Sequence, residues 1–288
     1  MTDINIVALS QTLCEDTAEI VAGGLCDLGY VCTIQMFRVN QRCLNIVMPA
    51  VFFPADNLTS MPSSTIFYNT EDLEHQMTPR QLAMLEILKR GFPVWDFSRQ
   101  NLPWYEAMGF ASAFHHVPLG YTSAVDHVVR RPWEERTIDV MFYGRLTTHR
   151  LETLDRLAAE GLSVGIFVNL YEAARNDMIS RAKLILNVPT RAPRGEYERP
   201  RLAFCASNGK LCVSEAPSYP VPRLWVDAAE FVSADELVAT CRAFATDRER
   251  LLQREARAYD AMRAMPIAPA LKDALARSCP ALPQAGTA

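Results

Sequence analysis

The 288-residue sequence has no long hydrophobic run, and this absence argues against a protein with membrane-spanning helices. The longest nearly apolar stretch, residues 44–53, is about half the ~20 residues that a helix needs to cross a bilayer. The first residues, Met-Thr-Asp-Ile-Asn, lack the positively charged segment and following apolar segment of a secretory signal peptide. We therefore expect neither a signal peptide nor an integral membrane segment.

The sequence also lacks a strong excess of either charge and any closely spaced cysteine pair. Its formal net charge is -4 and its pI is about 5.8, so no overall positive field draws it to nucleic acid or to anionic lipid. The eight cysteines are dispersed without a CxxC pair, whereas zinc sites and small disulfide frameworks need tight spacing. We expect reduced thiols, a cytoplasmic location, no bound metal and no nucleic-acid partner.

What the sequence does contain is a regular alternation of strand-like and helix-like segments. Strands are predicted at residues 4–9, 30–35, 44–53, 64–69, 93–98 and 114–121. The best-marked helix is 78–91, with Thr78 as N-cap, Pro79 at the first position, Gln81 completing a capping box and Gly91 as the stop. Such alternation is typical of parallel sheets with right-handed crossovers.

The alternation starts again after residues 122–137, a charged segment without clear periodicity that we interpret as a linker. Further strands are predicted at 138–144, 162–168, 183–188 and 210–216, with helices between them and a capping box at Ser233 and Glu236 that opens charged helix to about 263. We therefore predict an α/β protein of two Rossmann-like, doubly wound domains, residues 1–130 and 131–263, followed by a C-terminal tail, 264–288. Such domains bind ligands at the carboxyl ends of their strands, so two that face each other would form a cleft.

The segment FYGRLTTHR, residues 142–150, has the composition of an anion site where a strand passes into a helix. Exposed N–H groups and the positive end of the helix dipole meet at a helix N-terminus, where phosphate binds readily. The glycine would allow the backbone to approach closely, either threonine could cap the helix, and both arginines could offer charged forks. These residues are Gly144, Arg145, Thr147, Thr148 and Arg150. The alternative is an ordinary turn with surface arginines.

A second candidate for ligand binding is the segment ERPRL, residues 198–202. Glu198 precedes a predicted helix, and a carboxylate in a cleft can accept hydrogen bonds from both hydroxyls of a ribose. Arg201 would lie about one turn further on. Alternatively, Glu198 is only a favourable partner of the helix dipole.

These segments together resemble the C-terminal, nucleotide-sugar-binding domain of GT-B glycosyltransferases, most closely the bacterial group that includes the spore-maturation-type enzymes. The matching segments, in order, are FYGRLTTHR (142–150), ISRAKLILN (179–187), ERPRL (198–202) and NGKLCVSE (208–215). In the first half, IFYNTEDL (66–73), VWDFSRQN (94–101) and HVPLGY (116–121) are similar to strand ends of the same group. The resemblance covers most of residues 64–263.

The resemblance implies a nucleoside-diphosphate sugar bound to the second domain as donor substrate, and no cofactor. The contacting residues would be Gly144 and the 145–148 loop at the diphosphate, Glu198 at the ribose, Arg201 at a phosphate and Asn187 near the base or sugar. Departure of the nucleoside diphosphate requires stabilisation of its growing negative charge, which arginines and a helix N-terminus could provide without metal. The sequence has no Asp-x-Asp pair of the kind that metal-dependent glycosyltransferases use.

An inverting transfer would also need a general base near the acceptor hydroxyl, usually a carboxylate or a histidine. Candidates at strand ends of the first domain are Glu15, Asp16, Glu71, Asp72 and His75, of which Glu71 matches the family's strand end best. Each could instead be a helix cap or a surface group, and a retaining enzyme needs no such base. We expect Asp96 to be structural.

The leading hypothesis is a glycosyltransferase that moves a sugar from a nucleotide-sugar donor to a polysaccharide precursor, a protein or a small molecule. Two alternatives remain open: a nucleotide-sugar epimerase with the GT-B fold, and a non-catalytic nucleotide-sugar-binding subunit. Slow hydrolysis of the donor would separate the enzymes from the binding subunit, because water can replace the acceptor.

Overall fold

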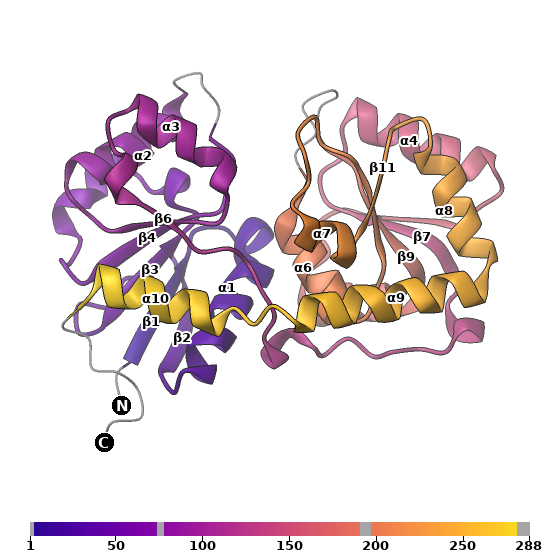
Figure 1. Ribbon diagram of the computed structural model, residues 1–288, viewed down its shortest axis with the longest axis horizontal. Coiled ribbons are helices and arrows are strands. Elements are labelled where there is room, and N and C mark those ends of the chain that lie inside the picture. The colour runs from indigo at the N-terminus through magenta and orange to yellow at the C-terminus, as the bar shows by residue number, and fades with distance from the viewer. Residues whose placement is uncertain (1–2, 74–77, 191–196, 281–288) are drawn as a thin grey trace. The chain divides into compact units, whose positions relative to one another are not determined.

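The computed structural model describes residues 3–73, 78–190 and 197–280 (Figure 1). The chain divides into two compact units: unit 1 comprises residues 1–124 and 266–288, and unit 2 comprises residues 125–265. Each unit is a parallel sheet flanked by helices, as the alternation in the sequence predicts. Within the described ranges, no helix combines the length and the apolar character needed to cross a membrane.

Unit 1 contains a six-stranded sheet in the order β2-β1-β3-β4-β5-β6, with all neighbouring strands parallel. Its strands are β1 (Asp3–Ala8), β2 (Val31–Met36), β3 (Leu44–Met48), β4 (Thr65–Asn69), β5 (Val94–Asp96) and β6 (Phe114–His116). Its helices are α1 (Gln11–Asp27), α2 (Pro79–Lys89), α3 (Leu102–Ala107) and α10 (Ala268–Ser278). The chain moves outward from β1 in both directions, which makes the sheet doubly wound.

The two faces of this sheet pack against different helices. Alternate strand residues such as Val7, Val47 and Phe67 face α2 and α3 in one apolar core. On β5, Trp95 points to the other face, and its Nε1 donates a hydrogen bond to Ser278 Oγ of α10 at 2.9 Å. The capping box predicted for α2 is present, with Thr78 and Gln81 bonded reciprocally.

Helix α10 corrects the prediction of a C-terminal tail for residues 264–288. Leu271, Ala274 and Leu275 are buried, and Ile267 and Leu271 approach Gly24 of α1 so closely that no larger side chain would fit there. Proline and alanine dominate this stretch, but a proline in the first turn is compatible with a helix. Helix α10 therefore belongs to unit 1.

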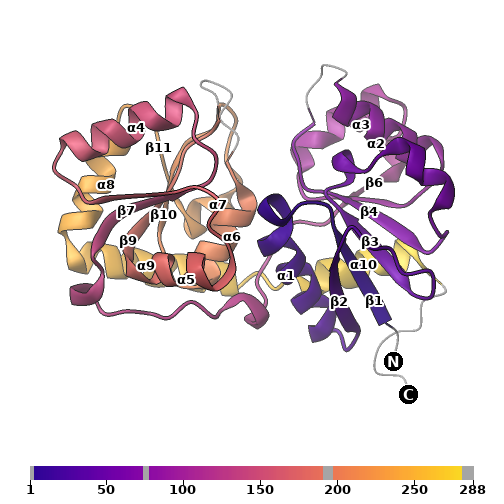
Figure 2. The same ribbon diagram turned by 180° about the vertical axis from the view of Figure 1, so that it is seen from behind.

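Unit 2 contains a five-stranded sheet in the order β11-β10-β9-β7-β8, also parallel throughout. Its strands are β7 (Ile138–Tyr143), β8 (Val164–Phe167), β9 (Ala182–Asn187), β10 (Cys212–Glu215) and β11 (Glu230–Val232). Its helices are α4 (Thr148–Ala159), α5 (Glu172–Arg181), α6 (Arg199–Ser207), α7 (Arg223–Ala228), α8 (Leu237–Thr246) and α9 (Arg248–Arg263). Helices α4 and α8 cover one face, whereas α5, α6 and α9 lie on the other (Figures 1 and 2).

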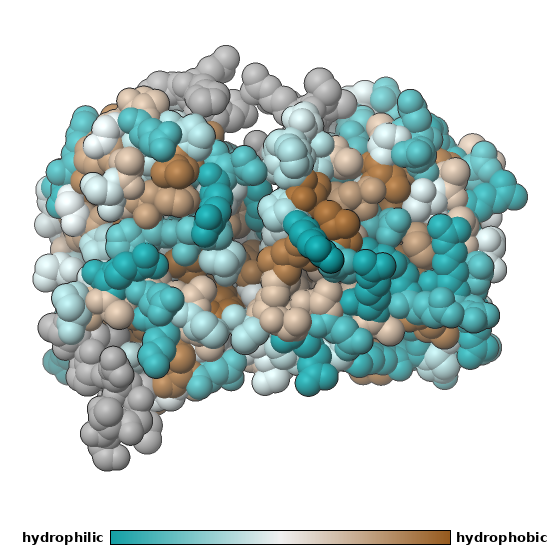
Figure 3. Space-filling model, viewed as in Figure 1, coloured by the Kyte–Doolittle hydropathy of each residue, from teal (hydrophilic) through white to brown (hydrophobic). Residues whose placement is uncertain are grey.

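Unit 2 differs from the sequence prediction in three places. The presumed linker at 122–137 is mostly part of this unit, because the backbone N–H groups of His127 and Val128 donate to Asn208 Oδ1 at 2.9 and 2.7 Å. Helix α7 and strand β11 were not predicted. The charged helix expected up to 263 is two helices that meet at Asp247, whose side chain caps α9. The surface over α8 and the adjoining part of α9 is largely hydrophilic (Figure 3).

Candidate functional site

Polar residues gather in unit 2 where β7, β9 and β10 end side by side. The loop after β7 leads directly into α4, and Thr147 is the N-cap that accepts a hydrogen bond from the backbone N–H of Arg150 at 3.4 Å. Asn187 ends β9, and its Nδ2 donates to Ser214 Oγ on β10 at 3.0 Å. The predicted strand-to-helix turn is therefore present, with the α4 N-terminus at the carboxyl edge of the sheet.

Arg201 reaches this edge from α6. Its Nη1 donates to Asn187 Oδ1 and its Nη2 to the carbonyl of Tyr143, both at 2.8 Å, and the guanidinium lies 4.6 Å from the centre of the Tyr143 ring. The residue is 8% exposed, and its buried Nε has no hydrogen-bond partner among the described residues. Arg201 thus ties β7 to β9 and leaves one N–H group without an acceptor.

Gly144 makes room for this arginine. Its φ is +129°, in a region that side-chain-bearing residues rarely adopt, and a Cβ built there would lie 3.2 Å from Arg201 Nη2. A glycine at the end of β7 is therefore required both by the turn and by the close approach of the guanidinium.

Arg150 is the second buried arginine at the site, and it is 3% exposed. Its Nε donates to the Val188 carbonyl at 2.8 Å and its Nη1 to the Arg145 carbonyl at 2.7 Å. Among the described residues, its buried Nη2 has no hydrogen-bond partner, and the nearest carboxylate oxygen is Glu198 Oε1 at 3.6 Å. Burial, and then the neighbouring Arg201, lower the pKa of Arg150 to about 10, so the side chain stays charged at neutral pH.

The two arginines form a cluster whose charge the described residues do not balance. Glu198 is the only carboxylate within ion-pair distance of either guanidinium in the described part of the chain, and its side chain is 46% exposed. A buried N–H without an acceptor costs about 1–3 kcal/mol, more where the donor is charged. An anion at the α4 N-terminus would supply both the missing negative charge and the missing acceptors.

The other predicted binding residues are placed less centrally. Arg145 and Thr148 are exposed, and Arg145 contributes its carbonyl, not its guanidinium, to the cluster. Thr147 serves as the cap of α4, and Glu198 stands at the N-cap position of α6 without a side-chain capping bond. The structure thus brings together Gly144, Arg150, Asn187 and Arg201, with Glu198 at the margin.

Sequence reasoning missed a polar pair at the same edge. His149, in the first turn of α4, has its Nε2 2.8 Å from Glu215 Oε2 at the end of β10, and the two side chains are 22% and 9% exposed. The signal available in the sequence was an acidic residue at the end of a buried strand, next to Ser214.

In unit 1, the preferred base candidate Glu71 follows β4 and is held by its backbone. The Glu71 carbonyl accepts hydrogen bonds from Asn69 Nδ2 at 2.7 Å and from Asn101 Nδ2 at 3.0 Å. Its Oε2 lies 3.8 Å from Arg80 Nη1, with the Glu71 side chain 28% exposed. Asp16 lies within α1, not in a loop after β1, and His75 lies outside the described residues.

The anchor of the Glu71 loop is Asp96, which was expected to be structural. It is fully buried, and its carboxylate accepts hydrogen bonds from Asn69 Nδ2, Asn101 Nδ2, Tyr105 Oη and the Ser98 N–H, at 2.8 to 3.0 Å. Burial raises the pKa of Asp96 to about 7, and these hydrogen bonds oppose a larger rise. The interpretation of Asp96 as structural agrees with this arrangement.

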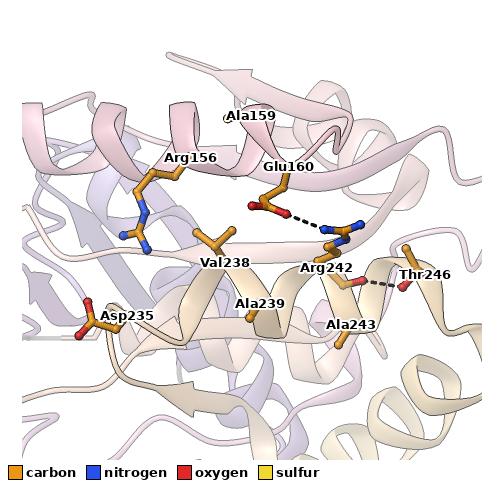
Figure 4. Close-up of a pocket in the computed structure, with 9 residues that line it drawn as sticks. All are labelled: Arg156, Ala159, Glu160, Asp235, Val238, Ala239, Arg242, Ala243 and Thr246. Carbon is orange, nitrogen blue, oxygen red and sulfur yellow. Dashed lines mark hydrogen bonds and ion pairs between the residues drawn. The ribbon is translucent and has the colours of Figure 1, made fainter.

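A surface groove of about 650 Å³ lies elsewhere on unit 2, between α4 and α8 (Figure 4). Its lining includes the ion pair of Glu160 Oε2 and Arg242 Nη1 at 2.6 Å, in which both side chains are largely exposed. The groove contains none of the clustered residues at the sheet edge. Within the described ranges, no group of three or more His, Cys, Asp or Glu residues is arranged to hold a metal ion.

No family model matches the chain, and a search of the curated proteins finds no match. Solved structures do match it in fold. AviGT4, a glycosyltransferase involved in avilamycin A biosynthesis, has a TM-score of 0.60 at 11% identity, covering 96% of this chain and 98% of its own. Sucrose-phosphate synthase from Thermosynechococcus elongatus has a TM-score of 0.60 at 11% identity, covering 98% and 100%.

The DNA-modifying enzyme β-glucosyltransferase, determined with and without its substrate uridine diphosphoglucose, has a TM-score of 0.50 at 12% identity, covering 96% of this chain and 99% of its own. These likenesses extend over nearly the whole chain. They show that the protein has the α/β architecture of GT-B glycosyltransferases, as the sequence predicts. At these identities the likeness concerns the fold.

Proposed function

We propose that the protein is a glycosyltransferase that takes a sugar from a nucleoside-diphosphate sugar and passes it to an acceptor, without a metal ion. The observation that carries this proposal is the buried pair Arg150 and Arg201 at the α4 N-terminus, with two N–H groups that lack acceptors among the described residues. A diphosphate has the charge and the oxygens that this cluster lacks.

The same cluster suits the chemistry of transfer. When the bond between the sugar and the diphosphate breaks, the leaving oxygens gain negative charge, and donors fixed in advance stabilise that charge without reorganising. Arg201 is fixed by Asn187 and Tyr143, and Arg150 by two backbone carbonyls. These contacts orient both guanidinium groups before any ligand arrives.

The remaining roles follow from position. We propose that Glu198, whose Oε1 lies 3.6 Å from Arg150 Nη2 and whose side chain is 46% exposed, accepts hydrogen bonds from ribose hydroxyls. Glu71, on its anchored loop in unit 1, is the proposed base if the transfer is inverting. The fold supports a nucleotide-sugar donor, since β-glucosyltransferase has uridine diphosphoglucose as its substrate. Assignment to the spore-maturation-type group depends on the sequence resemblance.

The test of the proposed donor site is a thermal-shift panel of UDP, GDP, CDP, ADP and dTDP sugars, with and without EDTA. A ligand that binds only the native state stabilises it by about 2.7 kcal/mol at a hundredfold excess over its dissociation constant. We expect one nucleotide class to raise the melting temperature, unchanged by EDTA. The proposal would be contradicted if no nucleotide sugar in the panel raised the melting temperature, or if EDTA abolished the increase.

The variant Arg150→Met then tests whether the hit binds at the cluster. Loss of a charged donor should weaken nucleotide affinity by about 10- to 100-fold, or ~1.5–3 kcal/mol. Arg156→Met is the matched control, because Arg156 is an exposed arginine of the same helix and lies in the groove of Figure 4. Equal affinity in the two variants would refute the assignment. Slow release of free sugar by the wild type would identify an enzyme, and a bound donor that stays intact would identify a binding subunit.

A further inference from the structure

The pair of His149 and Glu215 is a polar feature that the proposed roles leave unused. Nε2 of the imidazole lies 2.8 Å from the nearly buried carboxylate, and 66 positions separate the two residues in the chain. Each residue is a direct chain neighbour of the cluster: His149 precedes Arg150, and Glu215 follows Ser214, which bonds to Asn187. The pair therefore lies at the same sheet edge as the two arginines.

The contact with Glu215 determines what the ring offers to a ligand. A carboxylate only accepts hydrogen bonds, so the neutral imidazole carries its proton on Nε2 and presents Nδ1 as an acceptor. Within the described part of the chain, Nδ1 has no hydrogen-bond partner, and it is not a buried atom. The free nitrogen is thus accessible at the first turn of α4.

Helix stability does not account for this arrangement. A positively charged imidazolium near a helix N-terminus opposes the dipole, and the cap of α4 is already provided by Thr147. The Glu215 carboxylate, 9% exposed, has the histidine as its only ion-pair partner among the described residues. The nearly buried carboxylate therefore holds the partly exposed imidazole at this sheet edge, with the lone pair of Nδ1 free for a ligand.

We propose that His149, oriented by Glu215, accepts a hydrogen bond from a hydroxyl group of the nucleotide sugar. This inference builds on the proposed donor site and adds a residue that recognises the sugar component. A hydroxyl donates to a lone pair, whereas a fully ionised phosphate has no proton to give, so the ring is matched to a sugar and not to the diphosphate. The hydroxyl belongs either to the ribose or to the transferred sugar.

Two variants of His149 separate the two ring nitrogens. His149→Gln places an amide group near the position of Nε2, so it keeps a donor for Glu215 and loses the acceptor at Nδ1. His149→Asn places its amide group near Nδ1 and loses the contact with Glu215. Glu152→Gln, an exposed position one turn further along α4, is the control.

Affinities for the nucleotide sugar found in the panel and for its nucleoside diphosphate are measured by calorimetry. We expect His149→Gln to weaken nucleotide-sugar binding by about three- to tenfold, and His149→Asn to weaken it less. A purely structural pair would give the reverse order, because only glutamine keeps the bond to Glu215. An equal loss for the nucleoside diphosphate identifies the ribose hydroxyl, and a loss confined to the nucleotide sugar identifies the transferred sugar.

The inference fails alone if the wild type binds the donor, Arg150→Met weakens it and His149→Gln does not. It fails together with the proposed function if the wild type binds no nucleotide sugar. A ligand-free readout is the ¹⁵N spectrum of the neutral His149 ring, which reports which of the two nitrogens carries the proton. The proton should be on Nε2, and a proton on Nδ1 would overturn the proposal.

Discussion

Replacing Gly144 by alanine tests the close approach of Arg201 to the end of β7. The residue has φ +129°, and an added Cβ would stand 3.2 Å from Arg201 Nη2. The guanidinium would have to move by a few tenths of an ångström, although Asn187 and the Tyr143 carbonyl hold it at 2.8 Å. The substitution therefore changes both the backbone of the turn and the position of Arg201, which we propose contacts a phosphate group.

The size of the effect follows from these two contributions. Backbone strain at a glycine-only conformation costs about 1–3 kcal/mol, and displacement of Arg201 should weaken nucleotide binding by about three- to tenfold. Gly161→Ala is the matched control: Gly161 has φ +79°, and nothing lies within 4 Å of its added Cβ. That control should cost about 1–2 kcal/mol of stability and leave affinity unchanged.

Denaturant unfolding gives the stability change, and calorimetry gives the affinity. For a domain of this size, 1 kcal/mol corresponds to roughly 2–4 °C in melting temperature, so the loss is measurable for both variants. The reasoning is refuted if Gly144→Ala binds nucleotide as tightly as Gly161→Ala does. It is also refuted if Gly144→Ala leaves stability unchanged.

Two further predictions concern buried carboxylates. In Asp96 the folded-state pKa of about 7 exceeds the unfolded value of about 3.9, so its contribution to stability is present below ~pH 4 and is lost as pH rises towards 7. Relative to Asp96→Asn, the wild type should lose about 3 kcal/mol of unfolding free energy between pH 4 and pH 7. Denaturant titrations in which the two proteins lose stability in parallel across this pH range would contradict the prediction. Glu255→Gln breaks the buried pair with Arg136, whose Nη1 lies 2.8 Å from Oε1, and should cost about 3–5 kcal/mol. The exposed pair of Glu160 and Arg242 offers the control Glu160→Gln, expected within about 1 kcal/mol, and similar losses for both would be the contrary result.

Local pattern determined much of this protein from the sequence alone. Alternating apolar runs predicted two parallel sheets, and each predicted strand begins within two residues of an observed strand. Strand β11 and helices α7 and α10 were not predicted. The capping box at Thr78 and Gln81 formed as predicted, and Thr147 caps α4 where FYGRLTTHR indicated a helix N-terminus. These features depend on residues that are only a few positions apart in the chain, and local sequence patterns therefore predict them.

Features that depend on packing across the chain were decided only by the tertiary structure. The composition of residues 264–288 did not indicate that a helix here, α10, would pack against α1, which lies more than 200 positions earlier in the chain. Residues 122–137 looked like a linker because the amide of Asn208, which holds their backbone, is about 80 positions away.

The site shows the same division. The sequence supplied Gly144, Arg150, Asn187 and Arg201 as separate candidates, and the fold assembled them by placing β7 beside β9 and directing the α6 arginine across both. His149 and Glu215 were not paired in advance, because their contact requires the α4 N-terminus to reach the end of β10. Periodicity determines which face a residue occupies, but strand order and side-chain direction determine which distant residue it meets.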